Sequence, residues 1–329
     1  MLVLDAAAVR QALPTDAAIE AMRRAFAALS AGRATMPPRS RLPIRRHDGI
    51  SLVMPAFVDD ETEQALAVKV VSLFDRNADR GLARIQAAVL VLAPETGRPV
   101  ALLEGATLTA IRTGAASGLA ADLLARPDAR TAAILGAGVQ ARTQLEGLCA
   151  VRPIETFWVY DPALAAAEAF VRDMAGHGKA PLDIRRAASP REAVAQADII
   201  CAATTSRTPV FADADLKAGV HISAVGSYQP DVREVPTETV VRARVFVDSR
   251  EAALEEAGDL IQPIRQGAIT PDHIRAELGD LVLGRAAGRR SAADVTLFKS
   301  VGVAAQDAMA ARAAIERALR LGVGQTVAW

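Results

Sequence analysis

One arginine stands inside an otherwise apolar, helix-like segment, residues 105–125 (GATLTAIRTGAASGLAADLLA). Arg112 lies among side chains too short to shield it, and a guanidinium is costly to bury unless an anion meets its fork. The sequence therefore predicts an anionic partner for Arg112, either the carboxylate of a ligand or a buried acid such as Glu104. The helix is predicted from apolar residues at helical spacing, which would form one buried stripe: Leu108, Ile111, Ala115, Leu119 and Leu123.

A second chemical signal is the glycine-rich turn in ILGAGVQA, residues 134–141. Gly136 and Gly138 follow an apolar strand and precede a helix, which is the context in which such a turn binds a dinucleotide. The first glycine permits a tight turn, the second lets the backbone approach a pyrophosphate, and the helix N-terminus supplies an anion site. Asp161 ends the next strand, 161 − 138 = 23 residues later, near the ~20 expected for a ribose contact. A carboxylate there favours NAD over NADP, and the alternative interpretation is a helix cap before Pro162.

The composition of the 329-residue chain is that of a globular enzyme. Lys+Arg and Asp+Glu are 38 each and aromatic residues are 4%, which argues against nucleic-acid and acidic-membrane partners. Neither the two cysteines nor the four scattered histidines have the spacing of metal ligands, so no metal site is expected. The N-terminal segment does not resemble a signal peptide, and no apolar run reaches the ~18 residues that a membrane helix needs. We therefore expect a cytoplasmic protein.

Three regions differ in the rhythm of their apolar residues. Residues 1–120 contain a helix and strand-like runs separated by turn signals, which predicts a mostly antiparallel sheet with a helix on it. Residues 121–299 alternate short apolar strands with helices, which predicts an α/β domain with a Rossmann-type, doubly wound parallel sheet. Residues 300–329 hold a long Ala-rich helix outside this alternation, which we expect to complete the first region.

Short motifs in a fixed order cover nearly the whole chain, and together they are highly specific. Through these motifs the sequence resembles the ornithine cyclodeaminase/μ-crystallin family. In chain order the motifs are MPPRSRL, VMPAF, AVKVVS, TGRPVALLEGATLTAIRTGAASGLAA, LGAGVQA, ADIICAAT, AVGSYQPDVREV, VFVDS and VTLFKSVGVAAQD. The resemblance implies a dinucleotide-binding Rossmann-type domain inserted in an α+β substrate-binding and dimerisation domain. It also implies a homodimer.

The resemblance implies roles for several charged residues. Arg112 would bind the carboxylate of an amino or imino acid, and Lys69 would lie beside the reacting carbon; from the residues alone, Lys69 could equally be a solvated strand position. A further carboxylate-binding arginine is either Arg39 or Arg41, because residues i and i+2 of a strand face the same way. Arg41 is slightly favoured. A desolvated lysine beside arginines has a lowered pKa and can exchange protons near neutrality.

The glycine motif and the resemblance together predict a site for NAD(H), with NADP(H) as the alternative. Thr113 would contact a cofactor phosphate, and Ser300 and Gly302 would border the nicotinamide. The full set of expected cofactor-binding residues is Thr113, Gly136, Ala137, Gly138, Val139, Gln140, Asp161, Thr204, Val225, Gly226, Ser300 and Gly302.

Two departures from the family pattern bear on the substrate. Ornithine cyclodeaminases carry an aspartate where this chain has Tyr228, and a neutral phenol cannot act as that base. Tyr228 is expected to be a substrate-binding residue at this position. Asp231 follows three residues later but belongs to the pattern of reductases and dehydrogenases. Arg84 and Ile85 stand where many members have Thr-His or a similar polar pair. Arg84 is either a solvent-facing residue at a strand edge or a substrate-binding residue that selects an additional acidic group.

These observations predict an NAD(P)H-dependent reductase of cyclic imino acids that transfers hydride to C=N. The expected substrates are Δ1-pyrroline-2-carboxylate and Δ1-piperideine-2-carboxylate, which give L-proline and L-pipecolate. Three alternatives stay open: an NAD-dependent ornithine cyclodeaminase, an alanine-dehydrogenase-like enzyme, and a non-catalytic, μ-crystallin-like binding protein.

Overall fold

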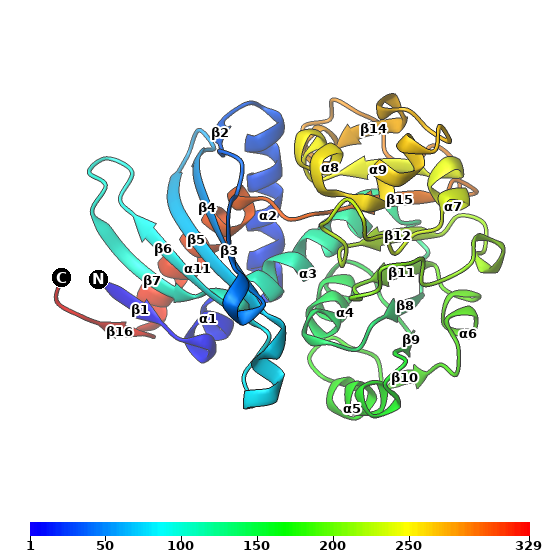
Figure 1. Cartoon of the computed structure of the whole chain (residues 1–329), viewed down its shortest axis with the longest axis horizontal. Helices are drawn as coiled ribbons and strands as arrows, with labels where there is room; N and C mark the ends of the chain where they lie inside the picture. The colour runs from blue at the N-terminus through cyan, green and yellow to red at the C-terminus, as the bar shows by residue number, and fades with distance from the viewer. The chain divides into compact units, whose positions relative to one another are not determined.

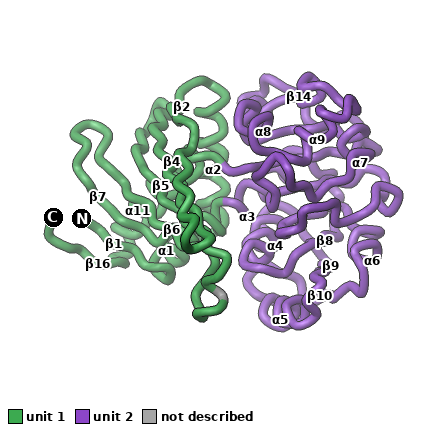
Figure 2. Tube along the Cα trace, viewed as in Figure 1, with its two compact units in different colours: residues 1–112, 303–329 green, residues 113–302 purple. Residues whose placement is uncertain are grey.

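The computed structural model describes residues 1–329 apart from the side chain of residue 78, and the chain divides into two units (Figure 2). Unit 1 comprises residues 1–112 and 303–329, and unit 2 comprises residues 113–302. The sequence predicts these divisions after residues 120 and 299. The first division falls inside helix α3 (Gly105–Leu124) because Gly114 and Gly118 of that helix pack directly on the backbone of the next helix in unit 2.

Unit 1 is built on a mixed, mostly antiparallel sheet (Figure 1). The order is β16-β1-β7-β6-β5-β4-β2, with β3 also paired to β4, and only β1 and β7 run parallel. Helix α11 packs against β4, β5, β6, α1 and α2. The C-terminal helix therefore belongs to this unit. The bounds are β1 Leu2–Leu4, α1 Ala6–Ala12, α2 Thr15–Ser30, β2 Ala34–Thr35, β3 Ser40–Ile44, η1 Arg45–His47, β4 Gly49–Asp59, β5 Gln64–Phe74, η2 Asp75–Arg80, β6 Ile85–Leu92, β7 Pro99–Glu104, α11 Ala304–Leu321 and β16 Gln325–Thr326.

Strand alternation decides which side chains of this sheet meet α11. In β5 the buried side chains are at odd positions, and Lys69 is one of them. In β4 the buried positions are even, and Met54 lies directly opposite Lys69. Because successive side chains of a strand point to opposite faces, Lys69 belongs to the covered face of the sheet. The sequence therefore buries a lysine among apolar neighbours.

Unit 2 is an eight-stranded, all-parallel sheet of order β10-β9-β8-β11-β12-β15-β13-β14, with apolar clusters on both faces. The predicted Rossmann-type sheet is thus confirmed. The order reverses between β8 and β11, and in such sheets ligands bind at this switch point, beyond the carboxyl ends of the strands. The bounds are β8 Thr131–Leu135, α4 Val139–Val151, β9 Thr156–Tyr160, α5 Leu164–Met174, β10 Asp183–Arg186, α6 Pro190–Val194, β11 Ile199–Ala202, η3 Asp213–Asp215, β12 His221–Ala224, α7 Thr237–Arg242, β13 Arg244–Val247, α8 Arg250–Glu256, α9 Gly258–Arg265, η4 Pro271–His273, β14 Ile274–Glu277, α10 Leu278–Val282 and β15 Thr296–Lys299.

Helix α3 does not have the single buried stripe that its sequence predicts. Every residue from 110 to 121 is buried. The cause is the close contact with α4, in which the backbones of Gly114 and Gly147 approach so closely that neither residue has room for a side chain. Because its residues are small, α3 lies close to its neighbours and is buried on all sides over residues 110–121. Among the described residues, no helix is both long and apolar enough to cross a membrane.

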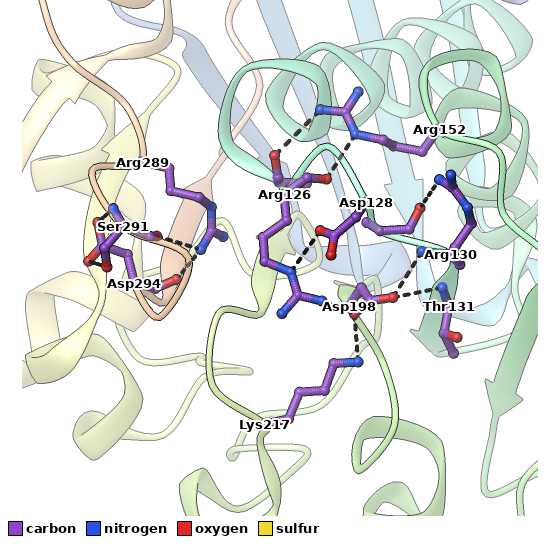
Figure 3. A network of polar contacts seen from close by, with 12 residues as sticks. Arg126, Asp128, Arg130, Thr131, Arg152, Asp198, Lys217, Arg289, Ser291 and Asp294 are labelled. Carbon is purple, nitrogen blue, oxygen red and sulfur yellow. Dashed lines mark hydrogen bonds and ion pairs between the residues drawn. The ribbon is translucent and has the colours of Figure 1, made fainter.

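Ion pairs hold together the amino edge of the unit 2 sheet (Figure 3). Asp198, which precedes β11, accepts hydrogen bonds from the backbone N–H groups of Arg130 and Thr131, both at 2.9 Å. Its other oxygen lies 2.6 Å from Arg126 and 2.5 Å from Lys217. These contacts join the starts of neighbouring strands. Asp198 therefore has a structural role at this edge.

Candidate active site

The centre of the site in unit 1 is an ion pair between β5 and α11. Lys69 is 3% exposed, and its Nζ donates a hydrogen bond of 2.5 Å to Oδ2 of Asp307. Burial lowers the pKa of Lys69 to about 8; Asp307 acts to raise it, while the positive charges of Arg112 and Arg39 act to lower it. Lys69 can therefore gain and lose a proton near neutral pH.

Arg112 shares the same carboxylate. Its Nε donates to Oδ1 of Asp307 at 3.0 Å, and Nη1 donates to the side chain of Gln306 at 3.3 Å. Burial opposes charge on Asp307, yet Lys69 and Arg112 hold the pKa of its carboxyl below the usual value. The anion predicted for Arg112 is thus present in the protein, but it is not Glu104. Glu104 instead accepts hydrogen bonds from two backbone N–H groups in the first turn of α3.

The charges of this cluster do not balance. Lys69 and Arg112 carry two positive charges, and Asp307 supplies one negative charge to both. Buried charges are tolerated when they are paired, so one further anion would complete the cluster. A small carboxylate has that charge and matches the planar fork of arginine.

The structure favours Arg39 over Arg41 as the third cation. Arg39 is half-buried and close enough to Lys69 to lower its pKa, whereas Arg41 is an exposed residue of β3. The slight preference for Arg41 is therefore not supported. The i and i+2 argument does not apply here, because β3 begins at Ser40 and Arg39 precedes it.

In unit 2, the glycine motif lies at the carboxyl end of β8 as expected. Gly136 has φ = +97°, a conformation that favours glycine, and a Cβ there would lie 2.6 Å from the carbonyl oxygen of Ala203. Gly138 precedes α4, and a Cβ there would meet no atom within 4 Å. The space in front of this helix N-terminus is open, as a pyrophosphate requires.

The residues after Gly138 also fit a dinucleotide. Val139 is 73% exposed although it is apolar, and the buried side-chain oxygen of Gln140 has no hydrogen-bond partner among the described residues. Asp161 accepts hydrogen bonds from the backbone N–H groups of Ala137 and Ala163, both at 2.8 Å. Its carboxylate therefore joins the glycine turn to the chain after β9. It is not the N-cap of α5, which is Ala163, so the helix-cap interpretation is not supported.

The remaining predicted cofactor residues lie after the neighbouring strands. Thr204, Val225 and Gly226 follow β11 and β12, and Ser300 and Gly302 follow β15. The last two are held by Asp248, which accepts hydrogen bonds from the Ser300 hydroxyl and the Gly302 N–H, both at 2.7 Å. Thr113 is a buried residue of α3 within unit 2.

Two further predicted substrate residues make other contacts. Tyr228 belongs to unit 2, where it packs against an apolar cluster after β12. Arg84 is exposed and pairs with Asp75 at 2.6 Å. The position of Arg84 agrees with a solvent-facing residue at a strand edge.

Sequence reasoning missed Asp307, the residue that joins Lys69 to Arg112. Asp307 is the last residue of the motif VTLFKSVGVAAQD, but nothing in that motif indicates which residues it contacts. Its partner Lys69 lies 238 residues earlier in the chain, so no spacing rule relates them. Asp248 was missed for the same reason.

Comparisons with known proteins agree with this architecture. The family model for ornithine cyclodeaminase/mu-crystallin proteins matches residues 1–321. A Delta(1)-pyrroline-2-carboxylate reductase of Bacillus cereus is 40% identical over 328 residues, 99% of each chain. The structure of Thermococcus litoralis Delta(1)-pyrroline-2-carboxylate reductase in complex with NADH and L-proline is 43% identical, with a TM-score of 0.94 over 99% of this chain and 100% of that one. An archaeal alanine dehydrogenase dimer with bound NAD is 31% identical, with a TM-score of 0.91 over 100% of this chain and 99% of that one. The chain belongs to the ornithine cyclodeaminase/mu-crystallin family.

Proposed function

We propose that this protein is an NADH-dependent reductase of cyclic imino acids, which converts Δ1-pyrroline-2-carboxylate to L-proline and Δ1-piperideine-2-carboxylate to L-pipecolate. The observation that carries the proposal is the sharing of one carboxylate by the buried Lys69 and Arg112. This cluster lacks one negative charge, which the carboxylate of an imino acid supplies. The activities of the relatives from Bacillus cereus and Thermococcus litoralis support the same substrate.

Each charged residue has a role in this reaction. Arg112 and Arg39 hold the substrate carboxylate and thereby orient the flat C=N group. When bound, NADH supplies the hydride to the imine carbon. Lys69 holds the proton that the substrate nitrogen takes up, and a pKa of about 8 leaves that proton available at neutral pH. Asp307 is a positioning residue, because it acts on the substrate through Lys69 and Arg112.

Unit 2 supplies the cofactor site. The open space at Gly138, the exposed Val139 and the unpartnered Gln140 side-chain oxygen support binding of a dinucleotide at the N-terminus of α4. The carboxylate of Asp161 supports NADH over NADPH, because a 2′-phosphate would bring a second negative charge beside it. The solved structures of relatives with bound NADH and NAD support the same choice.

The cyclodeaminase alternative requires a base that this chain does not provide at position 228. The proposed function is tested by following the absorbance of NADH with Δ1-pyrroline-2-carboxylate, in parallel with an assay of ammonia release from L-ornithine. Loss of NADH without release of ammonia supports the reductase. Release of ammonia without net loss of NADH would refute it, and turnover of pyruvate with ammonia alone would indicate an amino-acid dehydrogenase.

The protein forms a homodimer through the uncovered face of the unit 1 sheet. Antiparallel sheets usually present polar side chains to water on one face, but here the outer face also carries an apolar patch. Cross-strand pairing places these side chains on that outer face: Val53, Pro55, Val68, Val70, Leu90 and Leu102. Val53 and Val70 are 36% and 42% exposed. Such a patch usually marks an interface, and the dimer of the alanine dehydrogenase relative supports a second copy as its partner. Sedimentation of the wild type and of Val70→Lys tests this assignment.

A further inference from the structure

Unit 2 contains a second group of buried charges, which the proposed chemistry does not use. Glu234, Asp259 and Lys299 are each 0% exposed. Nζ of Lys299 lies 2.9 Å from Oδ2 of Asp259 and donates a hydrogen bond of 2.7 Å to the carbonyl oxygen of Ser227. Burying charged groups opposes folding unless each is paired and hydrogen-bonded. The cluster must therefore be explained by what it holds in place.

Glu234 joins the loops that follow β11 and β12. Its Oε1 accepts hydrogen bonds from the backbone N–H of Thr204 at 2.6 Å and from the Thr204 hydroxyl at 2.8 Å. Its Oε2 accepts from the N–H groups of Gly226 at 2.7 Å and Ser227 at 3.2 Å. A Cβ on Gly226 would collide with this carboxylate and with the carbonyl oxygen of Thr204, so the loops are packed to contact.

Asp259 and Lys299 hold the other parts of the same arrangement. Asp259 accepts hydrogen bonds from the N–H groups of Glu234 at 2.7 Å and Val235 at 2.8 Å, and from the hydroxyl of Ser227. Lys299 is the last residue of β15 and directly precedes Ser300. The cluster therefore fixes three neighbouring carboxyl ends of strands, those of β11, β12 and β15.

The place of these loops in the sheet indicates which part of the cofactor they meet. The glycine turn and Asp161 follow β8 and β9, on one side of the switch point. Strands β11, β12 and β15 lie on the other side. A doubly wound sheet binds a dinucleotide with one half on each side of this point. The loops that Glu234 fixes therefore belong to the nicotinamide half.

We infer that Glu234, Asp259 and Lys299 are positioning residues that set the loops of the nicotinamide half of the cofactor site. This inference rests on the proposed function only in that the cofactor is NADH. The cluster acts through Thr204, Gly226 and Ser227, and its three charged side chains stay buried beneath the loops. Its loss should weaken binding of the nicotinamide half and leave binding of the adenosine half intact.

The test compares two ligands on one variant. Glu234→Gln keeps the size of the side chain, but its amide group must turn N–H donors toward the N–H groups of one of the two loops. We expect the Kd for NADH, measured by calorimetry, to rise about tenfold, and the Kd for ADP-ribose, which lacks nicotinamide, to change less than about twofold. Asp198→Asn is the matched control, because it removes a buried carboxylate of unit 2 at the amino edge of the sheet. It should lower Tm and change neither Kd.

Equal weakening of NADH and ADP-ribose by Glu234→Gln would overturn the inference, as would an unchanged Kd for NADH. Should Glu234→Gln not fold, Ser227→Ala removes only the hydroxyl that contacts Lys299 and Asp259, and it must show the same selectivity for NADH. A wild-type protein that binds NADH but does not reduce imino acids would refute the proposed function and leave this inference standing. A wild-type protein that binds neither ligand would overturn both.

Discussion

Replacing Asp307 with asparagine keeps the size of the side chain and removes the negative charge that Lys69 and Arg112 share. In the wild type this charge acts to raise the pKa of Lys69, which burial holds at about 8. Without it, the ammonium form of Lys69 is less stable and its pKa falls. In the proposed mechanism the reaction needs the protonated lysine, so activity should be lost as pH rises through this pKa. The alkaline limb of the pH profile should therefore move to lower pH.

The geometry gives the size of this shift. At the 2.5 Å between Nζ and Oδ2, Coulomb's law gives about 1.7 kcal/mol at the dielectric constant of water and about 6.6 kcal/mol at an effective dielectric constant of about 20. One pKa unit corresponds to about 1.4 kcal/mol, so the smaller value already lowers the pKa of Lys69 by about one unit. Two buried cations also lose their partner, so the free energy of unfolding should fall by about 3–5 kcal/mol.

The assay is kcat/KM for Δ1-pyrroline-2-carboxylate at half-unit intervals of pH, with saturating NADH. The alkaline limb of the kcat/KM profile should lie near pH 8 in the wild type and about one pH unit lower in Asp307→Asn. Asp60→Asn is the control, because it removes a carboxylate that pairs with Arg24 elsewhere in unit 1. A folded Asp307→Asn enzyme with an unmoved limb would refute the assignment of Lys69 as the titrating group.

Further predictions concern the glycine turn, the carboxylate-binding arginine and Asp198. Gly138→Ala should leave Tm unchanged and raise the Kd for NADH by about tenfold, because its methyl group fills the space of the pyrophosphate. Gly136→Ala should instead lower the free energy of unfolding by about 1–3 kcal/mol, because its backbone has φ = +97°. Arg39→Ala should raise KM for the imino acid by about tenfold while Arg41→Ala stays within about twofold, and equal effects would contradict the preference for Arg39. Asp198→Ala should lower the free energy of unfolding, measured with urea near neutral pH, by about 3–5 kcal/mol. The pKa of Asp198 is below its usual value, so its contribution to stability is complete above the unfolded-state pKa and is lost as pH falls through the folded-state value; a cost that does not diminish in acid would contradict this.

The elements of the fold were predictable because their signals are local. The alternation in β5 and the strand–turn–helix pattern at Gly136 are each contained within about a dozen residues. The burial of α3 on all sides was not predictable, because it depends on Gly147 of another helix. The insertion of β15 between β12 and β13 was likewise missed, since strand order is set by crossovers rather than by the strands themselves.

The charged site shows the same division between local and distant information. Arg112 could be recognised as a buried cation in need of an anion from its own helix. The identity of that anion could not, because Glu104 is nearer in sequence but turns to the helix N-terminus. Asp307 reaches the site only because α11 returns to the first sheet. The role of Glu234 was missed in a similar way. Its carboxylate oxygens accept hydrogen bonds mainly from backbone N–H groups, and every residue type except proline has such a group.

The apolar outer face of the unit 1 sheet has a consequence for handling the protein. In the proposed homodimer a second chain covers this face, so the free energy of unfolding should include the free energy of association and Tm should rise with protein concentration. Dilution uncovers the apolar side chains around Val53 and Val70, which can then associate in unspecific ways. A slow loss of rate in a dilute assay would therefore report dissociation of the dimer, although Lys69 and Arg112 are unchanged.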